Sequence, residues 1–212
     1  MTGYPITLVG LERARCVVVG GGQIAARKVA ALRQAGAQPL VIAPDLCEAL
    51  QQQAQAGEIQ LVQRRYQPGD LEGARLVIAA TDDPATNEAV WQEAQVRGIL
   101  VNVVDDPPHC NFHVPATVRR GALTLSISTG GASPALARRI RQDLEQEYEA
   151  VYERYLALLG RLRPLIQETV SGTARRKALW EALLDSQILE LLRSSEYDAA
   201  EARASEIIQA YQ

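Results

Sequence analysis

The chain has 212 residues, of which 47% are hydrophobic and 22% charged, and its formal net charge at pH 7 is −3. This length suffices for one large domain or two modest ones, the acidic balance argues against nucleic acid as the main partner, and no apolar run is long enough to span a membrane. The N-terminus lacks the pattern of a signal peptide, and three scattered cysteines indicate reduced thiols, so we expect a cytoplasmic protein.

The first half of the chain alternates short apolar runs with segments of helical periodicity. The apolar runs are Cys16–Val19, Leu40–Ala43, Gln60–Val62, Leu76–Ala79 and Leu100–Val104, and the helical segments are roughly 23–35, 46–56 and 84–97. Runs that are apolar on successive residues are typical of strands covered on both faces, as in a parallel sheet. The alternation therefore predicts an α/β fold, with a Rossmann-like parallel sheet over residues 1–113.

A glycine-rich turn, VVVGGGQIAARK, directly follows the first predicted strand. Gly20-x-Gly22-x-x-Ala25 between a strand and a helix is the context that the dinucleotide-binding fingerprint requires. Gly20 would permit the tight turn, Gly22 the approach of a pyrophosphate, and Ala25 close packing of the helix on the strand. The free N–H groups of the helix would bind the phosphates. The alternative is a glycine-rich turn without a ligand.

Asp45 follows the second predicted strand, about 20 residues beyond the glycine turn, where an acid accepts hydrogen bonds from the adenosine ribose. A carboxylate at this position repels a 2′-phosphate, which favours NAD over NADP. The alternative is that Asp45 caps the next helix.

The fourth and fifth predicted strands end at the edge of the sheet where open α/β sheets bind ligands. Asp82 and Asp83 before Pro84 predict an N-cap and the start of a helix, so we expect them to be structural. The predicted cofactor contacts at this edge are Ala80, Thr81, Asn102 and Val103.

Two adjacent aspartates follow the fifth predicted strand. Asp106 precedes Pro107, which favours an extended conformation. Consecutive extended residues point to opposite sides, so only one aspartate can face the site. We expect it to be Asp105, the first residue beyond the strand, acting as an acid–base group.

The chain has only two histidines, His109 and His113, and both lie just after these aspartates, on either side of Cys110. Histidine and cysteine can bind zinc, but the prolines before His109 disfavour a helix that would present the ligands together. We predict no metal site, and packing or substrate contact for the histidines.

The sequence changes character after residue 116. Leu123, Leu125 and Ile127 alternate with polar residues and predict a strand with one buried face. Ser133 and Pro134 predict the start of a helix. Between residues 119 and 141 there are arginines but no acidic residues, and arginine binds carboxylates bidentately; the alternative is an ordinary basic helix face. From residue 148 onward the pattern is helical, so the expected division is 1–113, 114–147 and 148–212.

Four motifs in this order, VVVGGGQIAARKVAAL, VIAATDDPATNEAV, VNVVDDPPHCNFHVPA and SISTGGASPALARRIR, resemble the precorrin-2 dehydrogenase family, which is the N-terminal part of siroheme synthase. The resemblance implies NAD-dependent oxidation of precorrin-2 to sirohydrochlorin. Some members also insert ferrous iron to give siroheme. It further implies a homodimer formed through residues 114–147, and a chain without the C-terminal methyltransferase of the fused enzymes.

Carried onto this sequence, the resemblance assigns the functional aspartate to Asp105 and cofactor contacts to Gln23, Ile24, Pro44 and Asp45. The carboxylate-rich substrate gives a role to the arginines and to the loop before the helix; the expected substrate-binding residues are Arg119, Arg120, Thr129, Arg138 and Arg139. Thr129 stands where some relatives have a serine. The alternatives are another NAD-dependent oxidoreductase or a non-catalytic NAD-sensing domain on the same scaffold.

Overall fold

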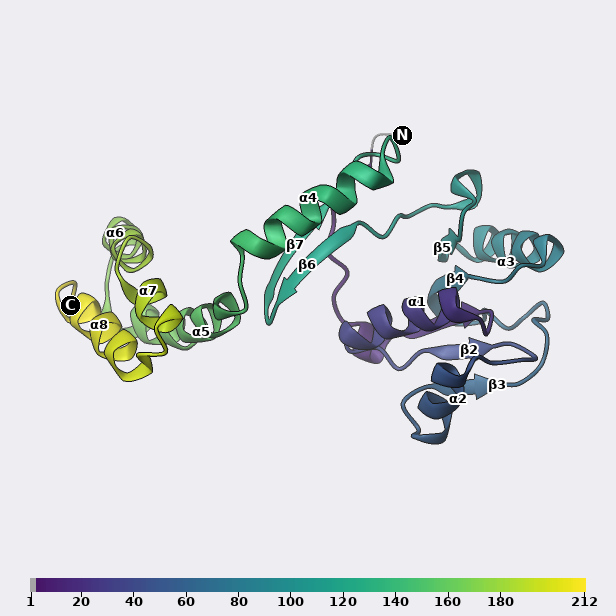
Figure 1. Ribbon diagram of the computed structural model, residues 1–212, viewed down its shortest axis with the longest axis horizontal. Coiled ribbons are helices and arrows are strands. Elements are labelled where there is room, and N and C mark those ends of the chain that lie inside the picture. The colour runs from purple at the N-terminus through teal and green to yellow at the C-terminus, as the bar shows by residue number, and fades with distance from the viewer. Residues whose placement is uncertain (1–2) are drawn as a thin grey trace. The chain divides into compact units, whose positions relative to one another are not determined.

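The protein, described by a computed structural model over residues 3–212, divides into two units, Tyr4–Val114 and Pro115–Gln212. Each unit has its own hydrophobic core. Two clusters of buried side chains lie in the first unit and a third lies in the second. Figure 1 colours the first unit from purple to teal and the second from green to yellow.

The first unit is built on a five-stranded sheet in the order β3-β2-β1-β4-β5, in which all neighbouring strands are parallel (Figure 1). The strands are β1 (Arg15–Val19), β2 (Leu40–Ile42), β3 (Gln60–Val62), β4 (Ala74–Ala79) and β5 (Leu100–Val103). The prediction of a Rossmann-like parallel sheet is confirmed. The fifth strand, however, ends at Val103, one residue earlier than expected, because the chain turns at Val104 and Asp105.

Helices cover both faces of this sheet, which explains why the strands are apolar on successive residues. The helices are α1 (Gln23–Gln34), α2 (Glu48–Gln55) and α3 (Pro84–Arg97). Val18 packs in one core cluster with α1 and α2, whereas its neighbours Val17 and Val19 pack in the other with α3. Ala25 is completely buried, so α1 lies close to the sheet as the fingerprint requires.

The residues after β5 cover the free edge of that strand. Asn111 does this with both its backbone and its side chain: its N–H donates to Val101 O (3.0 Å), its Oδ1 accepts from Val101 N (2.7 Å), and its Nδ2 donates to Ile99 O (2.9 Å). Cys110 lies beside it, after the 3-10 turn η2 (Pro107–His109). An amide side chain thus supplies the hydrogen bonds that a further strand would have made, and the edge is not left open.

The second unit begins with an antiparallel hairpin, β6 (Ala116–Arg120) and β7 (Leu123–Ile127). The side chains of β7 alternate between half-buried and exposed, as the sequence predicts. The strand β6 was not anticipated from its mixed sequence, ATVRR, and only its pairing with β7 defines it. Helix α4 (Pro134–Glu147) follows, with Ser133 as its N-cap, whose hydroxyl accepts a hydrogen bond from Leu136 N (3.2 Å).

Four further helices pack around the third core cluster: α5 (Val151–Thr169), α6 (Thr173–Leu184), α7 (Ile188–Arg193) and α8 (Tyr197–Gln209). The helical pattern around residue 186 is interrupted, since the Ser186 hydroxyl donates to Leu183 O (2.7 Å) and α7 starts anew at Ile188. Within residues 3–212, no helix combines the length and the hydropathy needed to cross a membrane.

Candidate functional site

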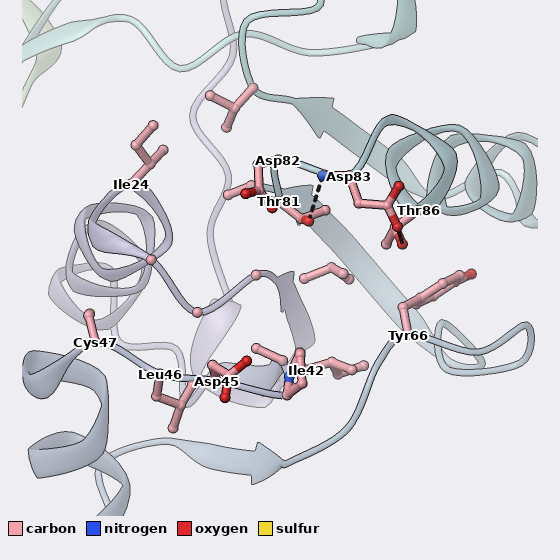
Figure 2. A pocket seen from close by; sticks show the side chains of 18 of the residues that line it. Ile24, Ile42, Asp45, Leu46, Cys47, Tyr66, Thr81, Asp82, Asp83 and Thr86 are labelled. Carbon is pink, nitrogen blue, oxygen red and sulfur yellow. Dashed lines mark hydrogen bonds between the residues drawn. The ribbon is translucent and has the colours of Figure 1, made fainter.

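A pocket of about 990 Å³ opens at the carboxyl ends of the strands in the first unit. Its lining comes from the segments after all five strands. Figure 2 shows Ile24 at the start of α1, Asp45 and Leu46 after β2, and Thr81, Asp82 and Asp83 after β4. β1 and β4 are neighbours at the centre of the sheet; from β1 the chain continues to β2 and β3 on one side, and from β4 it continues to β5 on the other. The strand order therefore reverses between β1 and β4, which is the switch point of the sheet. Open α/β sheets bind their ligands at such a point, and the volume is at the upper end of the range for ligand pockets.

The three glycines after β1 differ in what surrounds them. Gly20 has φ +127°, and a Cβ added there would lie 2.2 Å from Ala80 O. A Cβ on Gly21 would lie 1.8 Å from Asp45 O, and the Gly21 carbonyl accepts a hydrogen bond from Cys47 N (2.7 Å). A Cβ on Gly22 would have no protein atom within 4 Å, although Gly22 lines the pocket. Gly20 and Gly21 therefore permit close packing of the turn, whereas Gly22 keeps the pocket itself open.

The first turn of α1 presents free backbone donors to this pocket. Gly22 is the N-cap without a side-chain cap, and the first helical bond is Ala26 N to Gly22 O (3.0 Å). The N–H groups of Gln23, Ile24 and Ala25 therefore have no acceptor within the helix, and the first turn contains no acid. A helix N-terminus with an open glycine beside it fits a pyrophosphate. The residues present thus fit a dinucleotide cofactor.

Asp45 lines the pocket and is exposed to solvent. It does not cap the next helix, because α2 begins at Glu48 with Cys47 as its N-cap. Within the described part of the chain, its carboxylate makes no hydrogen bond or ion pair with another residue. The alternative of a capping role is thereby removed, and the carboxylate is available to a ligand.

Asp83, by contrast, caps a helix as predicted. Its carboxylate accepts hydrogen bonds from Ala85 N (3.1 Å) and from the Thr86 hydroxyl (2.6 Å), and the latter bond is the main reason that the pKa of Asp83 lies below its ordinary value. Figure 2 shows the bond from Asp83 N to the Thr81 hydroxyl (3.1 Å). The Thr81 backbone lies at the pocket rim with its carbonyl held by Asn87 Nδ2 (3.0 Å).

Two expected cofactor residues, Asn102 and Val103, do not belong to the lining. Val103 is buried in the core beside α3. Asn102 is 8% exposed, and its Nδ2 donates to Phe112 O (3.1 Å) in the segment that covers β5. The fifth strand contributes Val104 and Asp105 to the lining instead, because the turn that brings the chain to the pocket begins only after Val103.

Arg65 and Tyr66, which belong to none of the sequence motifs, line the pocket after β3. The Tyr66 hydroxyl donates to Glu93 of α3, which also accepts from Gly69 N (2.9 Å) and Arg97 Nε (2.7 Å). Burial first, and then this carboxylate, raise the pKa of the Tyr66 phenol, which stays protonated. The ring is therefore fixed at the pocket wall. The sequence signal that could have identified Tyr66 as a pocket residue is an aromatic side chain shortly after a predicted strand.

Asp105 has φ +60°, in the left-handed region that residues other than glycine rarely occupy. Asp106 N donates to Val103 O (3.3 Å), so Asp105 is the third residue of a four-residue turn. The premise that both aspartates are extended is wrong. The structure nevertheless separates them: Asp105 lines the pocket, and Asp106 turns to His109, whose Nδ1 lies 2.7 Å from Asp106 Oδ2.

The arginines expected to bind substrate belong to the second unit. Arg120 is held by main-chain carbonyls, since its Nε donates to Tyr148 O (2.8 Å) and its NH2 to Glu145 O (3.0 Å). Arg139 forms an exposed pair with Asp143 (3.3 Å). Arg119 and Arg138 are exposed and have no hydrogen bond or ion pair from their guanidinium groups to any residue between 3 and 212.

The remaining candidates in the second unit and in the histidine segment have structural partners. The Thr129 hydroxyl donates to Ser133 O (3.1 Å) and accepts from Ser133 N (3.1 Å), which ties the loop before α4. Across residues 3–212, no group of three or more His, Cys, Asp or Glu side chains is arranged to hold a metal ion. The Cys110 thiol bonds to Val103 and Asp106 backbone atoms, and burial raises its pKa.

Three family models match successive segments of the chain between residues 8 and 208. The model described as "Putative NAD(P)-binding" covers residues 8–116, the model of the sirohaem biosynthesis protein central region covers 120–147, and the model of the sirohaem synthase dimerisation region covers 151–208. The last of these lies C-terminal to the segment 114–147 that we expected to mediate dimerisation.

Proteins similar to this chain include several called siroheme synthase. The protein of Nitrosococcus oceani is 42% identical over 201 residues, which are 95% of this chain and 43% of that protein. The protein of Photorhabdus laumondii is 39% identical over 198 residues, 93% of this chain and 42% of that protein. The chain thus spans less than half the length of these relatives.

Among solved structures, the chain is similar to SirC, a precorrin-2 dehydrogenase, with a TM-score of 0.76 and 30% identity. This likeness covers 99% of the chain and 98% of SirC. The likeness thus extends over both units, and the family model covers the unit that holds the glycine turn, the open helix N-terminus and Asp45. The chain belongs to the family of precorrin-2 dehydrogenases and siroheme synthase N-terminal regions, and its first unit is a binding domain for NAD.

Proposed function

We propose that this chain oxidises precorrin-2 to sirohydrochlorin with NAD in siroheme biosynthesis. The observation that carries the proposal is one pocket that combines a dinucleotide-binding turn with a carboxylate, Asp105, presented at its rim on a turn with a positive φ. The full-length similarity to SirC supports the choice of substrate. An NAD-sensing domain would need the glycine turn but has no use for that carboxylate.

The chain's own residues would hold the cofactor from three sides. The N–H groups of the first turn of α1 donate to the pyrophosphate, and the open face at Gly22 lets it approach. The Asp45 carboxylate accepts hydrogen bonds from the ribose hydroxyls and repels a 2′-phosphate. The locked Tyr66 ring and Thr86 add a wall beside the pocket.

The reaction removes a hydride and a proton from precorrin-2. NAD supplies the hydride acceptor, and a residue must take the proton. Asp105 is the carboxylate of the β5 turn that reaches the pocket lining, and it is exposed, so it can act as the general base. Its neighbour Asp106 is engaged by His109 and is less available.

Three finer features extend this proposal. Insertion of ferrous iron into sirohydrochlorin also requires removal of protons, from pyrrole nitrogens, so Asp105 could serve both steps and chelation is the second activity to test. A homodimer is supported by the family description of residues 151–208, with 114–147 as the segment expected from the sequence. The cytoplasm is the compartment in which three free thiols would persist.

The test is an absorbance assay with precorrin-2 and NAD, followed by addition of ferrous or cobaltous ion. Asp105→Asn should lower the oxidation rate by about 10² to 10⁴, with the NAD dissociation constant unchanged by calorimetry. Asp106→Asn is the matched control and should cost less than about tenfold. Wild-type protein that binds NAD but leaves precorrin-2 unoxidised would refute the function. Near-normal turnover of Asp105→Asn would refute the assignment of the base.

A further inference from the structure

The turn that carries Asp105 is held in a conformation that its sequence alone does not favour. Asp105 has φ +60°, whereas Val104 before it does not have a positive φ, which is the arrangement of a type II turn. Such turns usually place glycine or asparagine at this position, because a Cβ is strained there. Surrounding contacts must therefore maintain the Asp105 conformation.

The inner side of the loop is fastened to β5. The Cys110 sulfur accepts from Val103 N (3.2 Å), and the thiol lies within bonding distance of Val103 O and Asp106 O (3.2 Å each). Asn111 completes the attachment along the strand edge. These contacts fix where the loop returns to the sheet, but none of them contacts the side chains of the two aspartates.

The outer side of the loop is fastened to α3 by His109. Its Nδ1 lies 2.7 Å from Asp106 Oδ2, and its Nε2 lies 3.4 Å from Glu88 Oε2 on α3. The imidazole also meets the ring of Trp91 edge-on, with 4.6 Å between the ring centroids. The two carboxylates face different nitrogens of one ring, which is a bridge between two segments and not a chelating arrangement. One end of this bridge is the residue next to Asp105, and the other is a helix that starts at the pocket.

We propose that His109 is a positioning residue: with Asp106 and Glu88 it ties the β5 loop to α3 and so holds Asp105 in the pocket lining. The proposal rests on the proposed function for its kinetic consequence, though the tie itself does not depend on any substrate. Removing the imidazole leaves Asp106 free to relax toward an extended conformation, and the strained Asp105 would relax with it. The carboxylate would then be misplaced for proton transfer, while the NAD contacts on α1 and after β2 would be untouched.

Kinetics provide the first test. His109→Ala should lower kcat for precorrin-2 oxidation by about tenfold or more, since misplacing a catalytic group is costly, without changing the NAD dissociation constant. His109→Asn keeps a donor at the position of Nδ1 but loses the contact of Nε2 with Glu88, so its kcat should stay below that of wild type. His113→Ala is the control, because His113 is exposed and makes no hydrogen bond or ion pair among residues 3–212. An unchanged kcat in His109→Ala, or a kcat fully restored to the wild-type value in His109→Asn, would overturn the proposal, because either result would show that the tie to α3 is not needed.

Hydrogen exchange provides a test that needs no substrate. The amides of Asp106, His109 and Cys110 are hydrogen-bonded within the loop. They should exchange at least about tenfold faster in His109→Ala than in wild type, whereas amides of α1 should not change. If the exchange rates stay the same, the tie does not exist. Faster exchange together with normal kcat would show a merely structural tie and would also overturn the positioning role. Failure of the proposed function would instead be seen as absence of oxidation by the wild type.

Discussion

Adding a single methyl group to each of two adjacent glycines should have opposite effects on this protein. In Gly21→Ala the new Cβ would lie 1.8 Å from the Asp45 carbonyl oxygen. The shortest ordinary carbon–oxygen distance is about 3.3 Å, so the two turns would have to separate by roughly 1.5 Å. The Cα that would carry the Cβ and the Asp45 carbonyl both belong to backbone that is held by the Cys47 N to Gly21 O bond. We expect a loss of at least about 3 kcal/mol, which lowers Tm by roughly 6–12 °C in a chain of this size.

In Gly22→Ala the new Cβ would meet no protein atom within 4 Å, and the glycine has an ordinary φ of −83°. The stability should therefore stay the same or rise by up to about 1 kcal/mol, because the unfolded chain loses conformational freedom. The methyl group would instead occupy the space through which the pyrophosphate approaches. NAD affinity should fall at least about tenfold, or roughly 1.4 kcal/mol.

The two variants are compared by thermal unfolding without ligand and by calorimetric titration with NAD. The expected pattern is an unstable Gly21→Ala and a stable Gly22→Ala that binds NAD poorly. Wild-type affinity in Gly22→Ala would refute the assignment of the open face of the turn to the pyrophosphate. Wild-type stability in Gly21→Ala would refute the close approach of the two turns.

Three further predictions follow from other parts of the chain. Wild-type protein should bind NAD at least about tenfold more tightly than NADP, and Asp45→Asn should reduce this ratio of affinities toward one. Equal affinities in the wild type would show that Asp45 does not contact the ribose. Arg138→Glu should raise KM for the tetrapyrrole about tenfold or more without changing the affinity for NAD. An unchanged KM would show that Arg138 does not bind the substrate. The pKa of Asp70 is lowered from 3.8, mainly by the hydrogen bond from Arg64, so the contribution of this carboxylate to stability is complete above pH 3.8 and is lost as the pH falls through the lowered folded-state pKa. Asp70→Asn should therefore make Tm fall less steeply at acidic pH than in wild type. An unchanged acidic part of the Tm-against-pH curve would contradict the pairing with Arg64.

Several features of the fold and site could be predicted from the sequence, because each depends on residues close together in the chain. Strands buried on both faces are recognisable as continuous apolar runs, and β3 was located to the residue. The N-caps Asp83 and Ser133 were correct, since a cap bonds to an amide two or three residues away. The turn at Gly20 and the packing of Ala25 follow from the same local motif.

Other features were decided only by contacts between distant segments. Gly21 is needed because the loop after β2 approaches it, and Tyr66 is fixed at the pocket by Glu93, 27 residues later. Asn102 was expected to bind the cofactor, but the segment that folds back over β5 supplies its partner. The strand β6 exists through its pairing with β7.

The aspartate pair illustrates the difference most directly. Composition and position identified two carboxylates at the end of a strand, and one of them was expected to face the site. The extended geometry used to choose between them was wrong, since Asp105 has a positive φ. The tertiary structure separates the two because His109, itself positioned against Glu88 and Trp91 of α3, binds Asp106 and leaves Asp105 to the pocket. A local sequence pattern determines which groups are present and how the nearby backbone can bend, whereas their directions depend on partners that only the folded chain brings within a few ångströms.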